Sequence, residues 1–138
     1  MAHASRPWWI IGSAAAWAHC ARTPVADIDV LADEDDAAEI LRATGSPYGA
    51  GSDSELFRSS VFGRFDGATL PIEVMGGLHV RSDRGWTKVV LTTREPVRIG
   101  DATIWVPSRP ELILLFLRFG RPKDLARAAL LGAARDER

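Results

Sequence analysis

The chain is poor in the residues on which disulfide-rich and metal-stapled proteins depend. Cys20 is the only cysteine among 138 residues, so the chain can form neither an internal disulfide nor a cysteine-rich zinc site. A single thiol is typical of proteins that work in a reducing compartment, and the cytoplasm is the simplest expectation.

The chain also lacks an excess of charge of one sign and a long apolar run. Its 17 basic and 18 acidic residues leave a net charge of -1, which argues against coating of nucleic acid or an anionic membrane through charge alone. The most apolar stretch, residues 8–21, is interrupted by Gly12 and Ser13 and falls short of the roughly 20 residues that a membrane span needs. We therefore expect no membrane segment and no export signal.

What is present is the composition of an ordinary globular domain. Hydrophobic residues make up 46% of the chain and charged residues 25%, and no internal repeat, low-complexity tract or linker divides it. A chain of this length buries roughly two-thirds of its unfolded surface, which is enough for a core without disulfides. The sequence thus predicts one domain over residues 1–138.

Helix and strand signals alternate early, and strands dominate later. Asp66-Gly67 is a hairpin signal, Ser13 can cap the first helix, and Ser108 with Pro110 opens the third. Strands are expected at residues 8–11, 27–31, 61–65, 70–75, 88–92, 97–99 and 102–106, helices at 14–21, 33–44, 109–119 and 123–131, and a loop at 48–54. This order predicts an α/β or α+β domain with a mixed sheet flanked by helices.

Two carboxylates lie on one predicted strand. Asp27 and Asp29 are two residues apart, so their side chains leave the same face about 7 Å apart at the backbone. Their repulsion is relieved by a divalent cation such as Mg²⁺, which takes one or two protein carboxylates and leaves positions for substrate phosphates. An isolated pair of this kind is also common on exposed strands, and that interpretation stays open.

A glycine and a serine precede this pair, between the first strand and the first helix. Gly12 would let a phosphate approach the backbone, and Ser13 adds a hydroxyl at the helix amino terminus, where free N–H groups favour an anion. The alternative is a tight turn followed by a plain helix cap. A phosphate site and a carboxylate pair separated by one short helix are together less easily explained by coincidence.

A third acid stands alone in an apolar run. Glu73 is the only charged residue in residues 70–75. If its strand lies beside the strand of Asp27 and Asp29, three carboxylates converge and can hold two metal ions about 3.5–4 Å apart. The alternative is a polar side chain on the exposed face of an edge strand.

These motifs together resemble the nucleotidyltransferase fold of the DNA polymerase β superfamily. The matching segments are Ile-Ile-Gly-Ser-Ala-Ala-Ala-Trp, Arg22-Thr23, Asp27-Ile28-Asp29-Val30, and a separate Ile72-Glu73-Val74. The sequence is most similar to small prokaryotic nucleotidyltransferase-like proteins, including toxin-type members of the AbiEii group. Those often carry Arg-x-Thr-x-Asp-x-Asp, whereas two extra residues lie here between Thr23 and Asp27.

The resemblance implies a nucleotidyltransferase-like mixed sheet flanked by helices, and a role for each matching residue. Gly12 and Ser13 would bind the β- and γ-phosphates of a nucleoside triphosphate. Asp27 and Asp29 would bind Mg²⁺ or Mn²⁺, with Glu73 as third metal carboxylate and general base.

Near the end of the chain, the resemblance implies further site residues and partners. The segment Arg121-Pro122-Lys123-Asp124 matches a late family motif, so Lys123 would contact phosphates and Asp124 would orient the base or the acceptor. The alternative for these two is a solvated pair at a helix start. An antitoxin or a HEPN-type protein is the partner that toxin-type members suggest.

Two functional hypotheses follow, with a third of a plainer kind. The first is a nucleotidyltransferase that passes NMP to a hydroxyl of RNA, a small molecule or a protein. The second is a non-catalytic module that binds a nucleotide or a partner, which the small size and a glutamate in place of the common third aspartate favour. The third is an interaction domain with accidental acids, whose carboxyl oxygens would lie more than about 8 Å apart.

Trp86 is one further candidate. It lies next to the polar segment that runs from Arg81 to Arg84. An indole in such surroundings could stack a base, although packing in a core or at a dimer contact is the commoner use.

Overall fold

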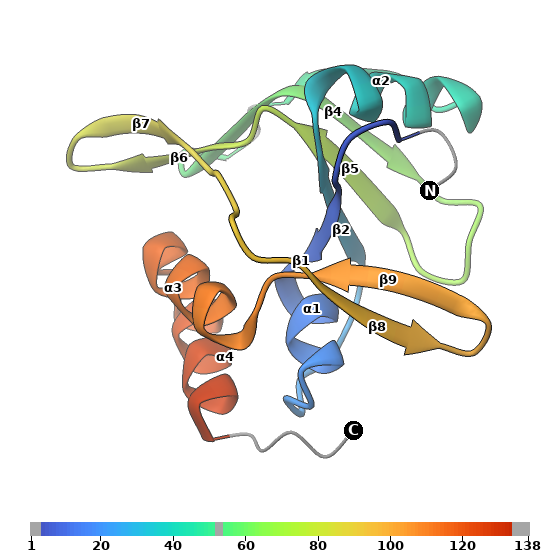
Figure 1. Ribbon diagram of the computed structural model, residues 1–138. Helices are drawn as coiled ribbons and strands as arrows, with labels where there is room; N and C mark the ends of the chain where they lie inside the picture. The colour runs from blue at the N-terminus through green and yellow to red at the C-terminus, as the bar shows by residue number, and fades with distance from the viewer. Residues whose placement is uncertain (1–3, 52–53, 134–138) are drawn as a thin grey trace. The chain divides into compact units, whose positions relative to one another are not determined.

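The computed structural model describes residues 4–51 and 54–133, whose contacts form two compact units (Figure 1). The unit called here the sheet unit comprises residues 29–90 and the N-terminal segment that ends at Trp8. The unit called the helical unit comprises residues 9–28 and the segment that starts at Leu91. One domain over residues 1–138 stays a prediction.

The sheet unit consists of strands with one helix, α2, packed on two of them. The strands are neighbours in the order β2-β5-β4-β6-β7, with β3 also paired to β4. The pairs that β4 makes with β3, β5 and β6 are all antiparallel, as is the pair of β6 and β7. The bounds are β2 (Ile28–Ala32), α2 (Glu34–Ala43), β3 (Tyr48–Gly51), β4 (Phe57–Phe65), β5 (Ile72–Gly76), β6 (His79–Ser82) and β7 (Gly85–Lys88).

The helix α2 covers one face of β4 and β5. Gly63 of β4 is opposite Val74 of β5, and both are buried. Gly63 lies so close to Leu41 of α2 that a Cβ on it would be 2.7 Å from a Leu41 methyl carbon. Because side chains alternate along a strand, Glu73 is on the opposite face, where it is half-buried. The packing of α2 therefore fixes which way the Glu73 carboxylate points.

Gly76 tests this packing. A Cβ on Gly76 would lie 2.7 Å from the Cα of Glu34, and a backbone atom cannot yield as a flexible side chain can. We expect Gly76→Ala to lower the free energy of unfolding by roughly 2 kcal/mol, measured by urea denaturation. Gly49→Ala is the matched control, because a Cβ there meets nothing within 4 Å. Equal stability of the two variants would contradict the packing.

The helical unit combines a hairpin with three helices. The strands β8 and β9 are antiparallel, β1 packs against β9, and α1 contacts both α3 and α4. Ala15 and Ala16 of α1 are fully buried, as are Leu112 of α3 and Leu131 of α4. The bounds are β1 (Trp9–Ile11), α1 (Gly12–Ala18), β8 (Glu95–Ile99), β9 (Ala102–Val106), α3 (Arg109–Phe119) and α4 (Pro122–Ala133).

Local signals set the start of α3. Ser108 is the N-cap, and its hydroxyl accepts a hydrogen bond from the backbone N–H of Glu111. The Glu111 carboxylate in turn accepts the backbone N–H groups of Thr92 and Thr93, at 2.9 and 2.8 Å. Burial raises the pKa of Glu111, but the hydrogen bond from the Thr93 hydroxyl and those from the two backbone N–H groups outweigh it and leave the pKa below its usual value. The predicted bounds 109–119 are confirmed.

Several predicted elements are wrong in extent. The first helix begins at Gly12 with Ile11 as N-cap, so Ser13 lies inside the helix and is not its cap. The hairpin of β4 and β5 exists, but Phe65 is opposite Ile72, so Asp66-Gly67 belongs to a longer loop. A strand, β3, occupies part of the expected loop 48–54, of which residues 52 and 53 lie outside the described residues.

The largest correction concerns the strand predicted at residues 88–92. Residues 79–88 form a hairpin of β6 and β7, whereas residues 89–92 are not a strand. The turn at Asp83 and Arg84 carries no strong turn dipeptide, so the sequence pattern missed it. The mixed sheet with flanking helices is nevertheless confirmed. None of the helices in the described part of the chain is long and apolar enough to cross a bilayer.

Candidate active site

Three acidic side chains gather where β2 and β5 lie side by side. Asp29 is the second residue of β2, Glu73 is the second residue of β5, and Asp27 directly precedes β2. One carboxylate oxygen of each residue lies within 4.8 Å of the others, and all three residues are half-buried. This separation is well below the limit of about 8 Å above which the acids could not share metal ions.

The donor set of this acidic cluster suits a small divalent cation. Two oxygens bound to one Mg²⁺ at 2.0–2.1 Å can be up to about 4.2 Å apart, so small side-chain rotations bring these carboxylates into range. Hard carboxylate oxygens are the ligands that Mg²⁺ and Mn²⁺ prefer. Partial exposure leaves further positions on such an ion open to a substrate.

The sequence did not predict that Arg64 would lie beside the acidic cluster. Arg64 of β4 is directly opposite Glu73 of β5, and its Nε donates a hydrogen bond of 2.9 Å to Asp66. Opposite residues of antiparallel strands have Cβ atoms about 4.5–5.5 Å apart on the same face. A two-residue turn at Asp66-Gly67 would have put residue 69 opposite Arg64. The wrong loop length therefore concealed this neighbour.

Gly12 and Ser13 form the first turn of α1. Gly12 has a φ of 70°, a conformation that glycine adopts without a steric penalty. Ser13 is buried, and the N-cap Ile11 offers no side-chain hydrogen bond to the first turn. The N–H groups at the start of α1 thus receive no cap from this position, as a site for a phosphate requires.

Comparison with known proteins bears on the fold. No family model matches the sequence, and no curated protein matches it. Four solved chains are similar, and three of them illustrate the range of sequence identity. A Thermotoga maritima protein provisionally assigned as a nucleotidyltransferase is 24% identical, with a TM-score of 0.74 over 91% of this chain and 81% of that one.

The other two are an antibiotic-resistance factor and an antibiotic adenylyltransferase. The antibiotic-resistance factor ANT(2'')-Ia is 12% identical, with a TM-score of 0.56 over 91% of this chain and 72% of that one. The lincosamide antibiotic adenylyltransferase LnuA is 11% identical, with a TM-score of 0.54 over 92% of this chain and 86% of that one. This chain has a nucleotidyltransferase-like fold. At these identities the likeness establishes the fold, while a link to the AbiEii toxin group stays a prediction.

Within this nucleotidyltransferase-like fold, Lys123 and Asp124 occupy very different surroundings at the start of α4. Lys123 is exposed. The Asp124 side chain is fully buried, and its two oxygens accept hydrogen bonds from Arg121 Nε at 2.5 Å and Arg121 Nη2 at 3.0 Å. Arg127 Nη1 approaches Asp124 to 3.9 Å. These contacts account for the burial of Asp124, and its predicted part in catalysis stays a prediction.

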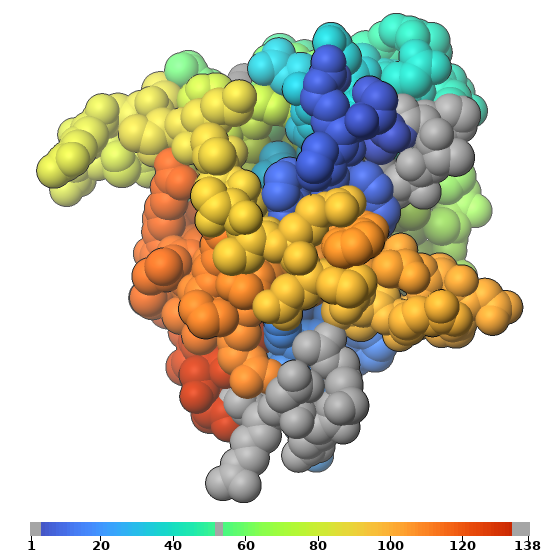
Figure 2. All heavy atoms as spheres, viewed as in Figure 1, coloured from blue at the N-terminus to red at the C-terminus, as the bar shows by residue number. Residues whose placement is uncertain are grey.

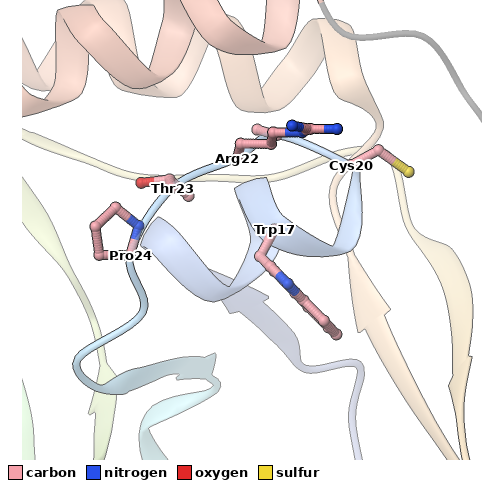
Figure 3. A pocket seen from close by; sticks show the side chains of 6 residues that line it. Trp17, Cys20, Arg22, Thr23 and Pro24 are labelled. Carbon is pink, nitrogen blue, oxygen red and sulfur yellow. The ribbon is translucent and has the colours of Figure 1, made fainter.

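The helical unit of the fold also carries a pocket of about 470 Å³ at the end of α1 (Figure 3). Cys20 at its edge has a φ of 71°, the only described residue other than glycine in this left-handed region. Pro24 is three residues before Asp27, so the two Cα atoms can be at most about 11 Å apart. The sequence did not predict this pocket, although Arg22 and Thr23 belong to a segment that resembles the nucleotidyltransferase fold. Its lining is Trp17, Cys20, Ala21, Arg22, Thr23 and Pro24.

Proposed function

We propose that this protein is a metal-dependent nucleotidyltransferase, which moves NMP from a nucleoside triphosphate to a hydroxyl acceptor and releases pyrophosphate. The observation that carries the proposal is the acidic cluster of Asp27, Asp29 and Glu73 within a nucleotidyltransferase-like fold. Three carboxylates this close repel one another unless a cation joins them, so such a cluster at partly exposed positions favours a metal-dependent reaction.

Each acid has a distinct part in the proposed reaction. Asp27 and Asp29 hold a divalent cation, Mg²⁺ or Mn²⁺, and Glu73 is the third carboxylate. A bound cation supplies neutralisation of the phosphate charge that develops during transfer. Glu73 takes the proton of the acceptor hydroxyl, whose oxygen bonds to the α-phosphorus. The bond from that phosphorus to the bridging oxygen of the β-phosphate breaks, and pyrophosphate leaves with the electron pair.

Groups of the helical unit bind the phosphates in this proposal. The uncapped N–H groups at Gly12 and Ser13 are donors for the β- and γ-phosphates. The exposed ammonium of Lys123 is a further phosphate contact. Contacts of this kind bind a triphosphate and orient its phosphates, and positioning supplies much of the acceleration in phosphoryl transfer.

Three acceptor classes remain: RNA, a small molecule and a protein side chain. Two of the similar structures hold small molecules: one ANT(2'')-Ia structure is in complex with adenylyl-2''-tobramycin, and the LnuA structure is bound to lincomycin. A small hydroxylated molecule is therefore one acceptor to test. A cytoplasmic toxin with an antitoxin or HEPN-type partner is the finer proposal that the sequence resemblance suggests.

The proposal is tested by incubating the protein with each α-labelled nucleoside triphosphate, with Mg²⁺ or Mn²⁺, and with RNA, protein extract or an aminoglycoside as acceptor. We expect pyrophosphate release and transfer of label to one acceptor class, both abolished by EDTA. A folded protein that binds a nucleotide yet releases no pyrophosphate in any mixture would contradict the enzyme and favour the non-catalytic module. The same assay identifies the preferred base.

A further inference from the structure

One face of the sheet unit gathers cations around a tryptophan. Arg58 of β4 is opposite His79 of β6, which is itself opposite Lys88 of β7, and Arg81 of β6 is opposite Trp86 of β7. Opposite residues share a face, and so do residues two apart along a strand. These five residues, called here the basic face, therefore lie on one side of β4, β6 and β7. All five are exposed or half-buried.

The basic face is an exception within a weakly acidic protein. Residues 79–88 contain three basic residues and one acidic residue, whereas the whole chain has a net charge of -1. Within the described residues, Arg81 and Arg84 form no ion pair, and both are exposed (β6 and β7 in Figure 1). The hairpin also stands out at the edge of the space-filling view (Figure 2). Cations that face water without a carboxylate partner are suited to an anionic ligand.

The tryptophan makes this surface more specific than a patch of charge. The guanidinium carbon of Arg58 lies 4.4 Å from the centroid of the Trp86 ring, so the cation lies over the face of the indole. Nucleic-acid bases stack on both indole rings and guanidinium planes, while neighbouring cations contact the phosphates. A surface that places one such ring among cations therefore offers a stacking position for a base and contacts for the neighbouring phosphates.

The basic face is continuous with the side of the sheet that carries Glu73. Arg58 and Arg64 are six residues apart on β4, an even number, so both point to one face of that strand. Arg64 is opposite Glu73. At about 3.4 Å per residue, β4 spans about 20 Å between these two arginines. One short strand of nucleic acid can therefore lie on the basic face and extend along β4 to Glu73.

We infer that the basic face binds a single-stranded nucleic acid, and that this strand is the acceptor whose terminal hydroxyl reaches Glu73. The inference deepens the proposed function and rests on it for the part of Glu73. The binding of the strand rests only on the basic face, and chiefly on Arg58, Arg81 and Trp86. The binding of the strand and the catalytic part of Glu73 can therefore fail separately.

Fluorescence anisotropy with a labelled RNA oligonucleotide of about 12 nucleotides tests the binding. We expect the wild-type affinity to fall steeply between about 50 mM and 200 mM salt, because phosphate contacts release counterions. Arg81→Glu is expected to weaken binding about tenfold or more and to reduce the salt dependence. Arg98→Glu is the matched control, because Arg98 is an exposed arginine on the hairpin of β8 and β9.

Substitutions of the tryptophan separate stacking from charge. Trp86→Leu is expected to weaken RNA binding about tenfold, and Trp86→Tyr to restore most of it, because tyrosine retains a face for stacking. Circular dichroism of each variant checks that the fold is intact. Equal binding by Trp86→Leu and Trp86→Tyr would contradict stacking on this residue.

Other ligands test whether the basic face is specific for a single strand, and one further variant tests whether binding is separate from transfer. Equal losses in Arg81→Glu and Arg98→Glu, equal affinity for an RNA duplex, or binding to phosphatidylserine vesicles without binding to RNA would each overturn the basic face as a single-strand site. Asp29→Asn is expected to bind RNA as the wild type does. RNA binding without transfer by the wild type would overturn the enzyme alone, and transfer to a small molecule without RNA binding would overturn the basic face alone.

Discussion

Replacing Asp29 with asparagine is expected to abolish nucleotidyl transfer while the protein stays folded. Asp29 lies on β2 and belongs to the acidic cluster. Its partners there are Asp27, two residues earlier in the sequence, and Glu73 on the neighbouring strand β5. Asparagine has almost the same shape but lacks the negative charge, so it weakens the hold on a divalent cation and leaves the backbone of β2 unchanged. Removing one of the three charges lowers the total repulsion within the cluster, which should slightly favour the folded state.

The expected loss is large because positioning and charge neutralisation supply much of the acceleration in phosphoryl transfer. Loss of a single stabilising group in such a site typically costs about 10²–10³-fold in rate. We expect Asp29→Asn to lower kcat by at least this factor, measured as label transfer from the preferred nucleoside triphosphate at saturating Mg²⁺. Thermal unfolding should change by no more than about 2 °C.

A matched variant separates the acidic cluster from a general loss of negative charge. Asp101 is an exposed acid in the turn between β8 and β9, so Asp101→Asn changes the net charge by the same amount outside the cluster. Asp101→Asn should transfer nucleotide at the wild-type rate. Full turnover in Asp29→Asn, with the same metal dependence as the wild type, would disprove the proposed site.

The second large effect is expected on stability and concerns Asp124. Its side chain is fully buried, and Arg121 and Arg127 provide its nearby positive charge. Asp124→Asn removes the charge on which both arginines converge and places an amide among hydrogen-bond donors. Breaking a buried ion pair in this way costs roughly 3 kcal/mol, which corresponds to a fall in Tm of about 10 °C for a chain of this size.

Lys123 supplies the comparison for this prediction. It precedes Asp124 in α4 but is exposed, so Lys123→Ala should leave the Tm within about 1 °C of the wild type. If Lys123 contacts a phosphate as proposed, the same variant raises the KM for the nucleoside triphosphate. An Asp124→Asn protein with wild-type Tm but no transfer would contradict a structural role and support a part in catalysis. Calorimetry and the label assay on the same samples give both readouts.

The parts of this protein that could be predicted from the sequence depend on short-range chemistry. The capping serine and Pro110 define α3, and its bounds agree with the prediction. Asp27 and Asp29 are two residues apart, so strand geometry alone places their side chains on one face. The start of α1 and the length of the loop between β4 and β5 were less predictable. Ser13 is a capping signal and Asp66-Gly67 is a turn signal, but in each case alternative positions for the cap or the turn have similar local energies.

Elements without a strong local signal needed the rest of the chain. The strand β3 is rich in glycine and forms because β4 offers hydrogen bonds to its backbone. The hairpin of β6 and β7 has an unremarkable turn, and its register is determined by pairing with β4 at Phe57 and Arg58. The basic face exists only through that register, since its five residues come from three strands.

By itself the sequence determined the acidic pair at the start of β2 and the helix that follows Ser108. Each depends on neighbours within a few residues, where propensity and spacing are decisive. Only the tertiary structure decided that β5 lies beside β2, which brings Glu73 within 4.8 Å of the pair, and that Asp124 is buried against Arg121. Contacts between residues far apart in the chain depend on which faces are buried together, and no local pattern specifies that choice.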